Sequence, residues 1–275
     1  MTGLQSQPKI SILIPFYKAD YFFDKCWESI VSQTYLSDEI IIVNDNSGDA
    51  SKKYLQKFEG TAKVIHLETS HGLGRARNIA IKNASNDWIA FQDADDLWEP
   101  TKLERQIQYL QENPEWIGCH TGVVTFDKTG PKATYINKPS PLRVSDLLMG
   151  SQVTPPSLLI RKQVLVDLGM FDTNFRTSED YEFSIRLAKS GNLLGFVPEP
   201  LIKVRRSNHG NLSSNGSRVL LNHIRLLRKH WDIFYGVGGA NNVRRFLGNS
   251  VCEAGGKMGG VFGELVYRVG RIVSF

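Results

Sequence analysis

The 275-residue sequence contains few cysteines and no long apolar run. Its three cysteines, Cys26, Cys119 and Cys252, lie far apart and form no CxxC pair, which argues against a disulfide framework or a zinc site. No stretch approaches the roughly 18 apolar residues of a membrane span. No basic region followed by an apolar segment opens the chain, so we expect no signal peptide. These absences favour a location in the reducing cytoplasm.

Acidic residues are scarce in the last quarter of the chain. From residue 201 to residue 275, twelve Lys and Arg residues stand against three acids, although the net charge of the whole chain is only +5. Such a basic segment favours an anionic partner, either phosphate groups or a membrane surface. No DNA- or RNA-binding signature accompanies the charge, so we expect no nucleic acid partner.

Short apolar runs alternate with amphipathic segments along the first part of the chain. The pattern predicts strands at 9–14, 39–43, 63–67 and 88–91, with helices between and after them. Such alternation predicts an α/β fold, a Rossmann-like and mostly parallel sheet with helices on both faces. Later segments predict added antiparallel strands and then C-terminal helices. We expect the first strand to end at Pro15, and a glycine-rich region from Gly236 to separate the last helices.

Three carboxylates follow the apolar run 88–91, in the sequence Gln92-Asp93-Ala94-Asp95-Asp96. The carboxyl ends of buried parallel strands face the edge where open α/β sheets bind ligands. Acids this close together repel one another unless a cation or hydrogen-bond donors compensate them. Hard oxygen ligands at this spacing suit Mg²⁺ or Mn²⁺, especially where phosphates complete the shell. The alternative is a turn whose acids are simply solvated.

Polar residues from other loops are expected at the same edge of the sheet. Right-handed crossovers place the loops after successive parallel strands side by side. The residues that would meet the acidic turn there are Phe16, Tyr17, Asp45, Arg75 and Arg77.

Five motifs taken together resemble a family 2 glycosyltransferase. In order, they are KISILIPFY (9–17), IIVNDNSGD (41–49), GLGRARN (72–78), WIAFQDADDLW (88–98) and SEDY (178–181). Several linked motifs are far more specific than any one of them, and the resemblance covers roughly residues 8 to 211. It implies a GT-A fold, a nucleotide-sugar donor, a divalent metal (Mn²⁺ or Mg²⁺) and inversion at the anomeric carbon.

The resemblance also divides the chain into three parts. Residues 1–125 would form a nucleotide-sugar-binding half. Residues 126–215 would form the acceptor-binding and catalytic-base half of the same domain. Residues 216–275 would form a basic helical extension.

The resemblance assigns nucleotide and metal contacts residue by residue. Asp45 matches the acid that hydrogen-bonds the nucleotide base, although Asn44 stands where the usual pattern has a second acid. Asp93 and Asp95 match a DxD motif, with Asp95 on the metal and Asp93 on the ribose or a metal-bound water. The other implied nucleotide contacts are Pro15, Tyr17, Gly72, Arg75, Arg77, Arg206 and His209. The residues alone also fit two other interpretations: a turn acid at Asp45, and solvated arginines on an amphipathic helix.

The SEDY motif supplies the implied catalytic residue. Asp180 matches the family's general base, and Glu179 is assigned to acceptor binding. The segment 177–180 also fits a capping box, in which acids are favoured by the helix dipole. The two interpretations are compatible.

The sequence thus predicts an inverting, metal-dependent glycosyltransferase. It would move a sugar, from a UDP-sugar in our first interpretation, to a glycan or lipid-linked acceptor in envelope polysaccharide biosynthesis. One alternative is a sugar nucleotidyltransferase, which needs a glycine-rich phosphate loop that the segment 15–18 lacks. The other is a degenerate, non-catalytic module that binds a nucleotide-sugar or glycan, for which Asn44 is the argument.

The C-terminal segment 257–275 mixes apolar residues with cations. One interpretation is a helix lying on an anionic membrane surface, which would make the protein peripheral on the inner face of the cell membrane. The other is a helix that packs on the catalytic domain or on a second subunit. The pattern favours neither.

Overall fold

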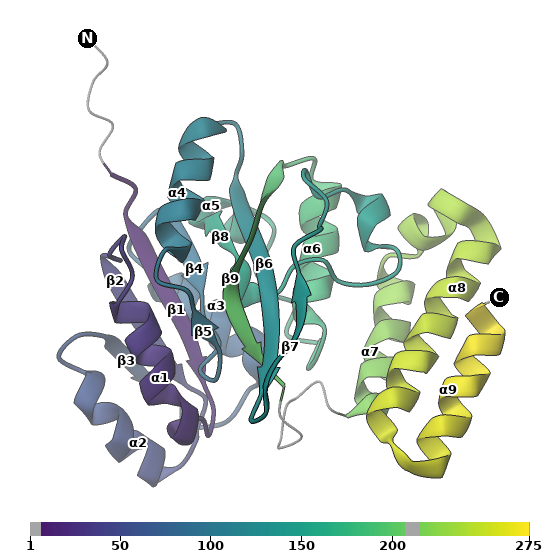
Figure 1. Cartoon of the computed structure of the whole chain (residues 1–275), viewed down its shortest axis with the longest axis horizontal. Helices are drawn as coiled ribbons and strands as arrows, with labels where there is room; N and C mark the ends of the chain where they lie inside the picture. Colours follow the sequence, from purple (N-terminus) through teal and green to yellow (C-terminus); the bar gives the residue numbers. More distant parts are fainter. Residues whose placement is uncertain (1–6, 207–214, 275) are drawn as a thin grey trace.

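The computed structural model describes residues 7–206 and 215–274. Its strands in these ranges form one nine-stranded sheet (Figure 1). The first half of the sheet is parallel and has the strand order β3-β2-β1-β4. These strands are β1 (Ile10–Phe16), β2 (Glu39–Asn44), β3 (Lys63–His66) and β4 (Trp88–Phe91). The predicted α/β class and parallel strands are confirmed.

The second half of the sheet mixes directions, as expected. β8 (Leu159–Arg161) runs antiparallel to β4 and to β6 (Gly118–Asp127). β9 (Leu194–Arg205) runs parallel to β6, and β5 (Leu97–Trp98) forms the antiparallel edge beside β9. The hairpin strand β7 (Gly130–Tyr135) pairs with the outer part of β6. The boundary expected at residue 125 therefore falls inside β6, and both halves share one sheet.

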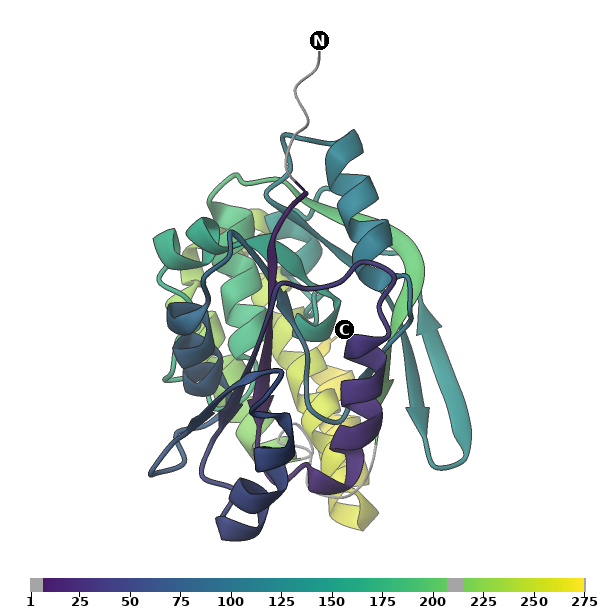
Figure 2. The ribbon, with the colours of Figure 1, turned by 90° about the vertical axis from the view of Figure 1, so that its left-hand side faces the viewer.

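Helices cover both faces of this sheet, as the view in Figure 2 shows. α1 (Asp20–Val31) and α4 (Lys102–Glu112) pack on one face against Ile10, Ile12 and Ile14 of β1. The opposite face, which carries Leu13, is covered by the remaining domain helices. These are α3 (Leu73–Asn83), α5 (Lys162–Asp167) and α6 (Glu179–Lys189). The short α2 (Asp49–Leu55) packs through Leu55 on the same face as α1. Alternate β1 side chains thus enter two separate cores, as a strand buried on both faces requires.

The first strand is longer than the sequence predicts. β1 does not end at Pro15 but continues to Phe16, in register with Val43 and Asn44 of β2. Proline lacks a backbone N–H, and by the alternation along a strand that nitrogen faces the β4 side. β4 pairs with β1 only as far as Leu13, so Pro15 leaves no ladder bond unmade there.

Three helices form the C-terminal extension, at the right of Figure 1. They are α7 (Gly216–Lys229), α8 (Trp231–Met258) and α9 (Gly260–Ser274). The glycine-rich region separates helical segments as predicted: Gly238 and Gly239 have non-helical backbone angles and divide α8 into two segments, and Gly259, with φ 66°, lies between α8 and α9. Leu226, Phe234 and Phe246 attach α7 and α8 to the core beneath α3 and α6. In the described ranges, no helix combines the length and apolarity needed to cross a bilayer.

Candidate active site

A cleft of about 1450 Å³ opens where β1, β4 and β9 end. It is walled by the acidic turn after β4, the N-terminus of α6, the hairpin β7 and the inner sides of α7 and α8. Residues that are remote in sequence therefore meet in one place. The sequence-predicted site residues that line the cleft are Pro15, Tyr17, Arg77, Asp93, Asp95, Glu179, Asp180 and Arg206.

The buried Arg77 joins two of these acids. Its Nη2 lies 2.7 Å from Oδ1 of Asp93, and its Nη1 lies 2.6 Å from Oε1 of Glu179. Burial raises the pKa of Glu179 to about 7, against the lowering effect of Arg77. Charged hydrogen bonds of this kind fix geometry as well as supply energy. Arg77 therefore holds the turn after β4 against the start of α6.

This geometry changes the roles that the sequence gave to Arg77 and Glu179. Arg77 was expected on the nucleotide, but both terminal nitrogens of its guanidinium are engaged by protein carboxylates. Glu179 was expected on the acceptor, but its side chain is only 5% exposed and points to Arg77. Both residues line the cleft and hold its two walls together.

The carboxylates of the acidic turn have different surroundings: Asp96 forms a structural hydrogen bond, whereas Asp95 lies beside the cleft. Oδ1 of the buried Asp96 accepts the backbone N–H of Arg205 at 2.7 Å, which fixes the end of β9. The Arg205 side chain in turn donates to the backbone carbonyl of Asp95 at 3.1 Å. Burial, reinforced by the neighbouring Asp93, raises the pKa of the Asp95 carboxyl to about 6. A carboxylate this destabilised by its surroundings gains most from a nearby cation.

The donor set fits a hard divalent ion with an incomplete protein shell. Within the described ranges, no three His, Cys, Asp or Glu side chains converge as a full metal site. Asp93 and Asp95 nevertheless offer carboxylate oxygens on one wall of the cleft. Mg²⁺ is commonly held by one or two carboxylates, with waters and substrate phosphates completing its shell.

Asp180 lies in the first turn of α6, partly buried and facing the cleft. Its Oδ1 accepts the backbone N–H of Tyr181 at 2.8 Å. Burial raises the pKa of Asp180, while Arg77 and that hydrogen bond oppose the rise. The capping box predicted for 177–180 is absent here: Ser178 at the N-cap is left-handed, with φ 63°, and makes no side-chain cap bond. The Asp180 carboxylate therefore takes no part in a capping box.

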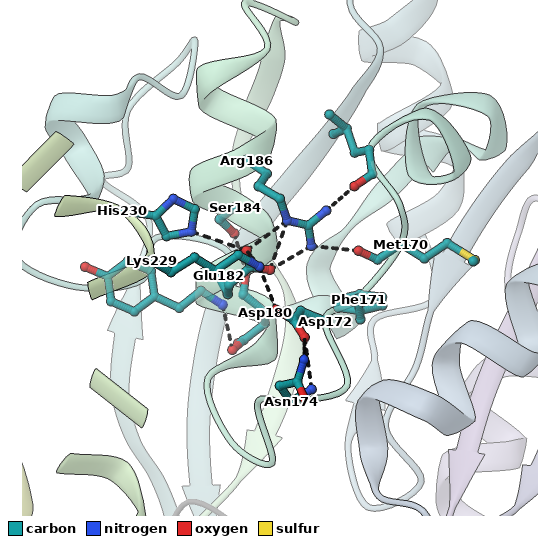
Figure 3. Close-up of polar contacts among 12 residues, drawn as sticks. Met170, Phe171, Asp172, Asn174, Asp180, Glu182, Ser184, Arg186, Lys229 and His230 are labelled. Carbon is teal, nitrogen blue, oxygen red and sulfur yellow. Dashed lines mark hydrogen bonds and ion pairs between the residues drawn. The ribbon is translucent and has the colours of Figure 1, made fainter. Parts of the chain in front are cut away.

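A buried carboxylate two residues further along α6 anchors this helix to α7 (Figure 3). Glu182 receives hydrogen bonds from Nε of Arg186 at 2.9 Å and from Nζ of Lys229 at 2.7 Å, and its Oε1 lies 3.2 Å from Nε2 of His230. Burial acts to raise the pKa of Glu182, but these bonds lower it to about 2. The sequence analysis missed this group, which holds the helix that presents Asp180.

Asp45 is placed at the carboxyl end of β2, as predicted, and holds a loop. Its buried carboxylate accepts hydrogen bonds from Oγ of Ser70 at 2.8 Å and from the backbone N–H groups of His71 at 2.7 Å and Gly72 at 2.8 Å. Gly72 has φ 88°, a conformation that favours glycine. Asn44 caps the same turn, because its Oδ1 accepts the N–H of Ser47 at 3.1 Å. Asp45 and Gly72, both predicted to contact the nucleotide, are thus joined to each other by a hydrogen bond.

Three predicted nucleotide contacts, Asp45, Gly72 and Arg75, are not among the residues that line the cleft. Arg75, two residues from Arg77 on α3, is exposed and is not part of the cleft wall. His209 lies outside the described residues. Arg206, at the end of β9, does line the cleft.

Comparison with known proteins decides which family has this arrangement. The sequence model described as Glycosyl transferase family 2 matches residues 11–165, more than half of the chain. The chain belongs to this family. The match spans the strands β1 to β4 and the acidic turn, so the predicted family is confirmed and the chain is a glycosyltransferase.

Two curated relatives and one solved structure show how far the similarity extends. The putative teichuronic acid biosynthesis glycosyltransferase TuaG of Bacillus subtilis is 30% identical over 213 residues, which cover 76% of this chain and 83% of that protein. The amylovoran biosynthesis glycosyltransferase AmsE of Erwinia amylovora is 26% identical over 227 residues, covering 79% and 84%. The structure of S. aureus TarS 1-349 in complex with UDP-GlcNAc superimposes with a TM-score of 0.66, covering 97% of this chain and 88% of that one at 15% identity. This similarity confirms the GT-A fold.

Proposed function

We propose that this glycosyltransferase moves a sugar, with inversion, from a UDP-sugar to a hydroxyl of a glycan or lipid-linked acceptor. The observation that carries the proposal is the meeting of Asp93, Asp95 and Asp180 in one cleft, connected through Arg77. The names of TuaG and AmsE, which refer to teichuronic acid and amylovoran biosynthesis, support a role in polysaccharide biosynthesis. The UDP-GlcNAc complex of TarS supports a uridine donor.

The chemistry follows from the placement of these side chains. The acceptor oxygen attacks the anomeric carbon, the bond from that carbon to the diphosphate breaks, and Asp180 takes the hydroxyl proton. Asp93 and Asp95 would hold Mn²⁺ or Mg²⁺, which when bound supplies positive charge for the departing diphosphate. Arg77 keeps Asp93 and α6 in fixed relation, so that the base and the acidic turn remain on opposite sides of the reacting carbon.

The first experiment separates transfer from the two alternatives. Purified protein is incubated with UDP-, GDP- and dTDP-sugars and Mn²⁺, and both nucleoside diphosphate and pyrophosphate are measured. A glycosyltransferase releases nucleoside diphosphate, by slow hydrolysis even without the natural acceptor. In a parallel reaction with a nucleoside triphosphate and a sugar phosphate, a nucleotidyltransferase releases pyrophosphate. A binding module releases neither product in either reaction.

The metal assignment predicts that EDTA abolishes release and that Mn²⁺ or Mg²⁺ restores it. The Asp95→Asn variant should lose metal-dependent nucleotide binding as well as turnover, because its amide oxygen is a weaker ligand for a hard cation. Asp87→Asn, at the other end of β4, is the matched control and should behave as wild type. Full activity in excess EDTA contradicts the assignment.

If Asp45 binds the nucleotide base of the donor, replacing Asp45 should change donor recognition. In Asp45→Ala we expect KM for the donor to rise about tenfold or more and discrimination between nucleotides to weaken, since a polar partner of the base is lost. Ser70→Ala is the control: it removes one hydrogen bond of the loop but keeps the Asp45 carboxylate. Unchanged donor preference in Asp45→Ala, or an equal effect of Ser70→Ala, would show that Asp45 acts only through the loop.

A further inference from the structure

Helix α9 packs against the protein through the side that carries glycines, and its large apolar residues point outward. Its buried residues are Gly263 and Gly270 alone, whereas Val261 is 90% exposed, Ile272 77% and Leu265 59%. The exposed Phe262 and Val269 continue the same side of the helix. A surface helix of a water-soluble domain turns its large apolar residues to the core. In α9 this order is reversed.

Close backbone contact between α8 and α9 explains the glycines. A Cβ added to Gly263 would lie 2.6 Å from the carbonyl oxygen of Gly255, and one added to Gly270 would lie 2.5 Å from the backbone nitrogen of Cys252. Gly255 is equally close to the backbone of Tyr267. Packing of small residues against one another, with large apolar side chains pointing away, is typical of helices in contact with lipid. The α8–α9 hairpin therefore presents an apolar face that this chain does not cover within its described residues.

Cations lie along one side of this apolar face. Arg244, Arg245 and Arg271 line a groove of about 790 Å³ along the hairpin. Arg268, 74% exposed, lies on α9 between the groove and the apolar face, where it forms an exposed ion pair with Glu264 at 3.0 Å. A second copy of this chain would bring the same cations together, which like-charge repulsion disfavours. Anionic lipid headgroups complement the arginines, and the acyl boundary of a bilayer accepts the apolar side chains.

The hairpin also lies close to the catalytic cleft. The turn between α8 and α9 is at the lower end of the molecule in Figure 1, where β1 also ends. Lys257, near the end of α8, lines the same cleft as Asp95 and Asp180. Binding of α9 to a surface would thus place the cleft close to molecules embedded in that surface.

We propose that the outward face of α9, together with the arginines of the adjoining groove, docks this glycosyltransferase on an anionic bilayer surface. Docking is peripheral, with the apolar side chains at the level of the headgroups and upper acyl chains. The inference goes beyond the transfer reaction and does not depend on it, because vesicle binding is measured without a nucleotide-sugar.

The test is sedimentation of the full chain with vesicles of phosphatidylglycerol and phosphatidylcholine, at low and high salt. We expect binding that requires the anionic lipid and weakens with salt. Leu265→Gln/Ile272→Gln keeps the charge and removes apolar area, and should reduce binding about tenfold or more. Arg245→Gln/Arg268→Gln keeps the apolar area and should remove most of the salt-dependent part. Leu36→Gln, an exposed apolar residue distant from the hairpin in sequence, is the control and should bind as wild type.

Each result decides the proposal. Binding to anionic vesicles that is lost in the α9 variants and kept in Leu36→Gln supports it, provided that circular dichroism shows the variants folded. No binding at low salt overturns it, and so does binding that the α9 variants do not change. A wild-type dimer in solution that Leu265→Gln/Ile272→Gln converts to a monomer also overturns it, since a second copy then covers the face.

Discussion

Replacing Asp180 with asparagine should lower kcat at least about a hundredfold and leave the donor Kd near the wild-type value. The asparagine keeps the shape of the side chain and can still accept the N–H of Tyr181, which Asp180 binds at 2.8 Å. It cannot take the proton of the attacking hydroxyl. Single-turnover release of nucleoside diphosphate and equilibrium binding of the same nucleotide-sugar, measured on one preparation, separate the two effects.

Asp180 also predicts the acid limb of the pH profile. Burial raises its pKa, so the wild-type rate should fall, as the pH is lowered, at a higher pH than an ordinary aspartate would give. The matched control is Asp167→Asn, the same change at an exposed acid outside the cleft, which should leave rate and profile unchanged. Normal turnover in Asp180→Asn, or weak donor binding from a damaged fold, excludes Asp180 as the base.

Replacing Arg77 with methionine should destabilise the fold by about 3–5 kcal/mol, because the buried Glu179 and the partly buried Asp93 lose their common cation. Removing the cation raises the pKa of Glu179 further above its value in the unfolded chain. The free energy of unfolding should therefore fall progressively as the pH rises above about 4.5, and the variant should approach wild type below it. Urea denaturation at several pH values measures this.

Arg75→Met is the control for this experiment, because Arg75 lies on the same helix with its side chain exposed. It should change stability by no more than about 0.5 kcal/mol. Equal effects of the two substitutions, or a loss in Arg77→Met that does not depend on pH, would contradict the proposed role of Arg77.

Much of the fold could be predicted because short-range patterns specify it. The apolar runs at 9–14, 39–43 and 88–91 are each long enough for one buried strand. The amphipathic segments between them predict helical crossovers, which connect parallel strands. The ends of those strands then located Asp45, Asp93 and Asp95 at one edge of the sheet. Here the periodicity of the sequence and the topology of the fold carry the same information.

Contacts between distant segments could not be predicted in this way. Arg77 and Glu179 are 102 residues apart, and no local pattern pairs them. The anchor of α6 combines Glu182 with Lys229 and His230, which belong to a different helical segment. Both are ion-pair interactions set by tertiary packing, whereas propensity and capping rules describe neighbours along the chain.

The glycine-rich extension could be predicted only in part, for a related physical reason. Glycines within a helix normally weaken it, so the sequence predicted separate helices after Gly236, and the helix does break at Gly238 and Gly239. The packing role of the later glycines could not be predicted. In the structure Gly255, Gly263 and Gly270 let two helix backbones touch, and that contact stabilises long helices despite the glycines. The decisive information is again a tertiary contact.

The most direct test of the account is the configuration of the first sugar released. With a nucleotide-sugar whose anomeric bond is α, proton NMR follows product formation before the free sugar equilibrates. Attack from the face where Asp180 lies, opposite the diphosphate, predicts that the β-anomer appears first and that Asp180→Asn suppresses it. An initial α-anomer would contradict the account, because it requires a second displacement that a single base at Asp180 does not provide.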